Sequence, residues 1–205
     1  MIKDFGGRVA RVWETLRPVT KNLIARELQA SPPQRENTRL FYDAHADLEL
    51  SSLLAALDEE SSSKEVRADR AKFVEISQLA NTCVRMLEAQ SASAEVFIQL
   101  ASRAIRENDY DKLDRLADRL MERYSAGEIA EVIRQTELPP IRAIAYETLA
   151  MLPVATIAPL LDDSLYADIA AAALEQKAYE FEDEEARICL EQFDAEMDAR
   201  ERSED

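Results

Sequence analysis

Glycine and histidine are nearly missing from this sequence. Its 205 residues include three glycines and one histidine. Folds built on β-sheets or on phosphate-binding loops use glycine freely in turns and phosphate cradles. We find no glycine-rich phosphate loop, no Gly-x-Ser-x-Gly motif and no cysteine–histidine nucleophile pair, and these are the signatures of common enzyme classes. We therefore expect a protein without enzymatic activity and without a bound cofactor.

Cysteine and long apolar runs are also scarce. The two cysteines, Cys83 and Cys189, lack the spacing of metal ligands and lie in helical apolar patterns. We expect reduced, packed thiols, with a disulfide as the alternative. Charged residues interrupt the first fifteen positions, so we expect no signal peptide. No window reaches about 18 apolar residues, which predicts no transmembrane segment and a cytoplasmic protein.

Strong helix formers are abundant instead. Alanine, leucine, glutamate and arginine dominate the chain, and apolar residues at 47% suffice for a core. The connections between the predicted helices are short, so successive helices are expected to be antiparallel neighbours. The sequence predicts an all-α fold, arranged as an α-solenoid-like stack of antiparallel helix pairs. An irregular helical bundle is the alternative.

The negative charge is unevenly distributed. The net charge is −16, yet residues 1–40 carry eight basic and four acidic side chains. We predict a basic amphipathic N-terminal helix over 1–30, an acidic helical-repeat body over 37–200 and a frayed tail over 201–205. An acidic body repels phosphates of nucleic acid and anionic lipid. The expected partner is therefore another protein with a basic surface, with no direct binding to nucleic acid.

Apolar periodicity and capping residues predict the helix boundaries. A first helix over about 8–30 should be kinked or broken at Pro18, because proline lacks the amide donor. A loop at 31–34 precedes a helix capped by Asn37 or Thr38. That helix runs to about Leu57, and a break follows at 58–63, in which a serine caps the next helix. Further helices are predicted at about 64–90 and 93–106, from Asn108-Asp109, at 127–135, from Pro139, and, as a short one, between Pro153 and Pro159. A long last helix, capped by Asp162, Asp163 or Ser164, breaks near 182–185.

The N-terminal helix is the main candidate for binding a partner. Its basic side chains lie mostly off the apolar stripe, and its tryptophan is a plausible interface anchor. Such a helix can dock into a partner groove or lie on anionic lipid. Alternatively, its stripe packs on the rest of the chain, with the arginines solvated or facing acidic residues. The candidate partner-binding residues are Arg8, Arg11, Trp13, Arg17 and Lys21.

Two sets of ionisable residues could in principle support chemistry. His45 lies between Asp43 and Asp47, but a metal site needs convergent ligands and this spacing favours a solvated helix face. The carboxylates of 111–122 alternate with lysine and arginine, which is typical of an outer helix face with weak i,i+4 pairs. We expect no metal site in either place.

Part of the chain resembles a known repeat family. Ile141-Arg142 followed by Ala145 and Leu149 resembles the second helix of a HEAT-like repeat, and the segment from Leu160 through Asp163 to Leu174 looks like the same element again. The second copy has Ala167-Asp168 where the family has a Val-Arg pair, which puts the inter-repeat hydrogen bond of that arginine in doubt. The resemblance covers about 125–176 and implies stacked helix pairs. The positions it marks as structural are Ile141, Arg142, Ala145, Leu149, Asp163 and Leu174.

These observations predict a non-catalytic protein–protein interaction module, a HEAT-like adaptor or scaffold. The alternative is an acidic decoy that inhibits a basic, nucleic-acid-binding partner, in which case binding should weaken steeply with salt. A metal-dependent enzyme that uses the acidic clusters is the least favoured function.

Overall fold

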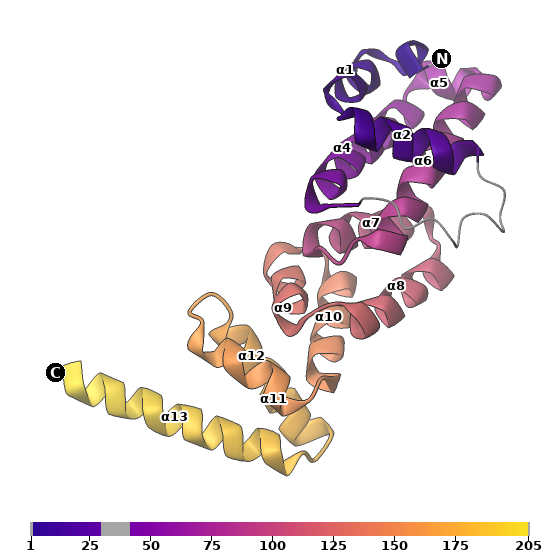
Figure 1. Cartoon of the computed structure of the whole chain (residues 1–205). Coiled ribbons are helices and arrows are strands. Elements are labelled where there is room, and N and C mark those ends of the chain that lie inside the picture. Colours follow the sequence, from indigo (N-terminus) through magenta and orange to yellow (C-terminus); the bar gives the residue numbers. More distant parts are fainter. Residues whose placement is uncertain (1, 30–41, 205) are drawn as a thin grey trace. The chain divides into compact units, whose positions relative to one another are not determined.

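The computed structural model describes residues 2–29 and 42–204, and within them it contains twelve α-helices, two short 3-10 helices and no strand (Figure 1). The predicted all-α fold is therefore confirmed for the part of the chain that the structure describes. The chain divides into two compact units, Met1–Ser91 and Ala92–Asp205. This boundary differs from the predicted one between an N-terminal helix and a body, because residues 2–29 belong to the first unit.

The first unit is built on two long helices, α4 and α6, which pack against each other. Helix α1 packs on α4 and α2 packs mainly on α6, and the apolar side chains of these helices fill a common core. Leu50, Leu54 and Leu57 from α4 are completely buried, as are Ile76 and Leu87 from α6. The elements of this unit are η1 Ile2–Phe5, α1 Gly7–Thr15, α2 Pro18–Gln29, α4 Ala44–Ser61, α5 Lys64–Ala68 and α6 Arg70–Gln90.

Local chemistry sets several of these boundaries as predicted. Pro18 separates α1 from α2 and occupies the first turn of α2, where its missing amide hydrogen has no helical partner to lose. Ser63 caps α5, its hydroxyl accepting from the amide of Val66 at 3.2 Å. The single helix predicted over 64–90 is wrong, because Asp69 ends α5 and caps α6.

Helix α4 begins and ends at other places than we predicted. It starts at Ala44, and the carboxylate of Asp43 accepts from the amide of Ala46 at 2.9 Å. The predicted caps, Asn37 and Thr38, and the loop at 31–34 lie outside the described residues. The helix continues through the acidic run to Ser61, since aspartate and glutamate are compatible with a helix and only the serines that follow end it.

The second unit consists of three successive helix pairs and a short connecting segment. In the first pair α7 packs on α8, in the second α9 packs on α10, and in the third α12 packs on α13. Neighbouring pairs meet through α7 with α9, α8 with α10, and α12 with both α9 and α10. The elements are α7 Ala94–Glu107, α8 Tyr110–Arg123, α9 Ala126–Gln135, α10 Pro139–Met151, α11 Val154–Ile157, η2 Ala158–Asp162, α12 Ala167–Glu180 and α13 Glu184–Glu204.

Most boundaries of the second unit match the prediction. Asp109 caps α8, accepting from the amide of Lys112 at 3.0 Å, and Asn108 has the left-handed conformation that ends α7. Glu182, at φ 54°, separates α12 from α13 in the predicted acidic run. The predicted cap of α12 is wrong. Asp163 instead closes a turn, accepting from the amide of Leu165 at 2.9 Å, and α12 begins only at Ala167.

Helix α13 continues to Glu204, so fraying of 201–205 stays a prediction. Among the described residues, no single helix is long and apolar enough to cross a membrane, although α10 and Val154–Asp162, bent by 118°, together have the length and composition of a broken span. Both parts of that pair contribute to the core, since Ile141, Ala145 and Leu149 of α10 and Ile157 of α11 are completely buried.

Candidate functional site

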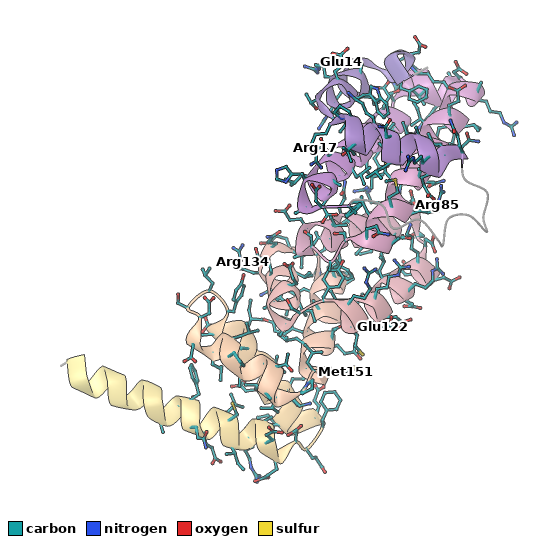
Figure 2. The ribbon with its side chains drawn as sticks, viewed as in Figure 1. Glu14, Arg17, Arg85, Glu122, Arg134 and Met151 are labelled. Atoms are coloured by element: carbon teal, nitrogen blue, oxygen red, sulfur yellow. The ribbon has the colours of Figure 1, made fainter. Side chains whose placement is uncertain are left out.

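Arg17 stands at the junction of α1 and α2, where it binds two carboxylates of the α4 region (Figure 2). Its two terminal nitrogens donate to Asp43 at 2.9 and 2.7 Å, and its Nε donates to Glu49 at 3.0 Å. The guanidinium lowers the pKa of Asp43 well below its usual range. Burial alone would raise the pKa of Glu49, but hydrogen bonds from Thr20 and Arg17 lower it. Arg17 therefore holds α2 against α4.

The other basic candidates of the N-terminal segment are also engaged within the first unit. Arg8 forms an ion pair with Glu59, and the Nζ of Lys21 lies 5.8 Å from the ring centroid of Trp13. Arg11 is exposed and its Nε donates to the carbonyl of Gly7 at 3.3 Å. Phe5, Val9, Leu16 and Leu23 of its apolar stripe are buried in the core of the unit, whereas Val19 and Leu28 are exposed. The stripe thus packs in part on its own chain, as in the alternative named above. Partner binding by these residues stays a prediction.

The positions that the repeat resemblance marked divide into core and surface. Ile141, Ala145, Leu149 and Leu174 are completely buried and contribute to the packing of the second unit. Arg142 is exposed, and its guanidinium lies 5.9 Å from the ring centroid of Tyr146 one turn further along α10. Asp163 holds the turn before α12, as described above. The apolar positions of the pattern thus serve the core.

His45 and the carboxylates around it do not converge. His45 is exposed in the first turn of α4, whereas Asp43 binds Arg17 and Asp47 accepts from Ser91 at 2.9 Å. Tyr42 also donates to Asp47, and burial raises the pKa of Tyr42 above its usual range. Among the residues whose side chains the structure describes, no group of three or more His, Cys, Asp or Glu could hold a metal ion.

Both cysteines are free thiols. Burial raises the pKa of Cys83 to about 12, and burial also raises the pKa of the half-buried Cys189. A thiol that stays protonated at neutral pH is a poor nucleophile and a poor metal ligand. Cys83 is therefore a small apolar residue of the first unit's core.

A polar cluster that sequence reasoning missed joins α9 to the start of α12. The Tyr166 hydroxyl donates to Glu131 at 2.9 Å, and the Nε of Arg134, labelled in Figure 2, donates to the same carboxylate at 2.6 Å. The Arg134 hydrogen bond is the main cause that lowers the pKa of Glu131 to about 2. Nothing in the sequence signals this contact, because Tyr166 lies 35 positions after Glu131.

The negative charge of the chain belongs almost entirely to the second unit. The first unit carries 13 basic and 14 acidic residues, whereas the second carries 12 basic and 27 acidic ones. The first unit is nearly neutral because residues 41–91, with five basic and ten acidic side chains, offset the basic residues of 1–40. The net negative potential of the protein therefore originates mainly in the second unit.

The turn between α12 and α13 also exposes large apolar side chains. Tyr179 is 84% exposed, Phe181 47% and Ile188 46%. We call the exposed residues around this turn, Tyr179, Phe181, Glu182, Glu185 and Ile188, the turn surface. It borders a hollow lined by Ala178, Glu182, Asp183, Glu184 and Arg187. The sequence predicts only an acidic run that breaks a helix here, although Tyr179 and Phe181 alternate with Glu180 and Glu182 just before and at its start.

Comparisons with protein-family models, with curated proteins and with solved structures found no match to this chain. The HEAT-like resemblance of 125–176 therefore stays a prediction.

Proposed function

We propose that this protein is a non-catalytic protein–protein interaction module whose second unit binds a partner through its helical surface. The observation that carries the proposal is the concentration of acidic residues in that unit, 27 against 12 basic ones. A surface with this balance attracts a basic protein surface and repels nucleic acid. We place this activity in the cytoplasm and assign it no cofactor.

We further propose that the second unit is a short α-solenoid-like stack of helix pairs. Support comes from the packing of α7 with α9 and of α8 with α10, which joins each pair to the next. Stacked pairs bury a continuous core and leave an extended surface free for a partner. An adaptor or scaffold function uses such a surface without bond-making groups.

The alternative function is that of a decoy which occupies a basic, nucleic-acid-binding protein. The same charge imbalance favours it, because a unit with 27 acidic residues offers a partner the same kind of charge that a phosphate backbone offers. The two functions differ in one respect. Nucleic acid competes with a decoy for the partner, whereas it leaves an adaptor's binding intact when the partner uses another surface.

Affinity capture with the intact chain tests the proposal. The immobilised chain is expected to retain a specific protein that an unrelated helical protein of similar net charge does not retain. Raising the ionic strength from about 0.05 to about 0.5 M should release it, because screening at about 0.5 M acts within a few ångströms. Addition of nucleic acid then separates the decoy from the adaptor. Absence of a specific protein, or retention that salt leaves unchanged, would contradict the proposal.

A further inference from the structure

We infer that the turn surface is the docking site and that it binds an arginine-rich segment of the partner protein. This inference rests on the proposed function and adds the place and the chemistry of recognition. Apolar side chains of the turn surface are exposed. Three large apolar side chains lie exposed within ten positions, on both sides of one tight turn. Single exposed apolar residues are ordinary on a protein surface, whereas three around one turn, set among polar residues, offer a partner more apolar area than one residue does.

The charge around these side chains selects a cationic occupant. Residues 175–195 contain eight carboxylates and two basic side chains. Both basic side chains are bound within the segment, since Lys177 lies 3.4 Å from Asp183 and Arg187 forms an ion pair with Glu184. The other carboxylates, Glu182 and Glu185 among them, give the surface a negative potential. A basic segment is therefore the complementary partner.

The combination of aromatic rings and carboxylates favours arginine over lysine. A guanidinium can stack on an aromatic face while its nitrogens donate in pairs to a neighbouring carboxylate. Tyr179 and Phe181 supply rings, and the exposed Glu182 and Glu185 of the turn surface supply carboxylates. Lysine supplies the charge but not the planar, bidentate contact.

The turn holds these groups in place before a partner arrives. The amides of Phe181 and Asp183 both donate to the carbonyl of Lys177, at 3.2 and 3.4 Å. The carboxylate of Asp183 accepts from the amide of Ala186 at 3.1 Å, and Lys177 reaches the carbonyl of Ala150 in α10 at 3.3 Å. Because the backbone is fixed by these bonds, little order has to be imposed on binding.

Short peptides of equal length test the inference on the intact chain. One is arginine-rich, one has lysine at every arginine position and one is neutral. We expect the arginine peptide to bind more tightly than the lysine peptide, and the neutral peptide not to bind. The variant Y179A/F181A should weaken binding of the arginine peptide by about tenfold, since two exposed cation–π contacts are lost. The variant E182Q/E185Q should weaken binding of both charged peptides.

Matched variants on α8 control for composition and charge. Y110A/M121A removes exposed apolar groups from the same unit, and D111N/D114N removes two exposed carboxylates. Both should bind the arginine peptide like the native chain. Circular dichroism checks that each variant stays folded, and Y179Q, at the most exposed of these positions, replaces Y179A/F181A if that variant unfolds.

Two results would overturn the inference. One is equal affinity of the native chain for the arginine and lysine peptides, and the other is an equal effect of the α8 and turn variants. A protein captured equally well by the native chain and by Y179A/F181A also rejects this site but leaves the proposed function intact. Failure of the proposed function itself is different, because then the native chain captures no protein.

Discussion

At the scale of single residues, Arg17, one of the candidate partner-binding residues, forms ion pairs within the first unit. Arg17 donates to Asp43 and Glu49, which follow it by 26 and 32 positions. The sequence shows that Arg17 lies off the apolar stripe, but it does not show which carboxylates approach from another helix. The periodic apolar pattern of the N-terminal segment correctly predicts that Val9 and Leu23 are buried, whereas Val19 and Leu28 of the same stripe are exposed.

Replacing Arg17 tests this structural role. Arg17→Ala should reduce the free energy of unfolding, and by more than a substitution at an exposed, weakly bound arginine does, because two carboxylates lose charge-assisted hydrogen bonds and Glu49 is half-buried. Urea denaturation measures the change. Arg11→Ala, at an exposed position of the neighbouring helix, should stay within about 0.5 kcal/mol of the native chain. Equal effects of the two substitutions would mean that Arg17 does not hold α2 in place.

Glu131 makes stability depend on pH in the acidic range. Its pKa is lowered from 4.5 to about 2, mainly by the hydrogen bond from Arg134. The unfolded chain therefore binds a proton at higher pH than the folded chain, and stability falls as the pH drops from about 4.5 to about 2. In Glu131→Gln, the loss of unfolding free energy across this range should be smaller.

Urea denaturation at a series of pH values checks this prediction. Glu137→Gln, an exposed position beyond the end of α9, serves as the control and should keep the native pH dependence. A variant Glu131→Gln whose stability falls with acid as steeply as that of the native chain would contradict the role assigned to the Arg134–Glu131 pair.

At the scale of helices, the sequence predicts those boundaries that a local residue determines alone. Pro18, Ser63 and Asp109 mark their helix ends as expected, because proline and the short polar side chains act on neighbouring backbone groups. Asp69 was missed because buried positions on both sides of it fit one apolar stripe. The prediction that Asp163 caps a helix is wrong, since its carboxylate closes a turn and α12 starts only at Ala167.

Removing the cap at Asp69 should destabilise α6. The Asp69 carboxylate accepts from the amides of Ala71 and Lys72, both at 3.1 Å. Asp69→Ala should lower the free energy of unfolding by about 1 kcal/mol, as for other N-cap residues. Glu75→Ala, exposed on the same helix, should have little effect. If Asp69→Ala is neutral in thermal or chemical denaturation, tertiary packing alone keeps α5 and α6 apart.

At the scale of the whole molecule, the contrast in charge between the two units links fold to function. The candidate site could be predicted from the sequence only in its general character, an acidic surface suited to a basic partner. Its position could not, because exposure of Tyr179 and Phe181 depends on which face of α12 packs on α10 and where the turn to α13 falls. Helical periodicity alone does not rank the faces of an alanine-rich helix such as α12, since alanine fits both core and surface.

The same contrast predicts that salt stabilises the two units to different extents. In the second unit, 27 acidic residues face 12 basic ones, so repulsion between like charges opposes its folding at low ionic strength. Raising the salt concentration from about 0.02 to about 0.3 M shortens the range of this repulsion several-fold. Hydrogen exchange of the intact chain should therefore slow markedly in α7–α12. Exchange in α4 and α6 should change little. The first unit is nearly neutral, and the added salt also weakens its favourable ion pairs, such as the one between Arg17 and Asp43. Equal slowing in both units would show that the charge imbalance of the second unit is offset within its fold and is not available to attract a partner.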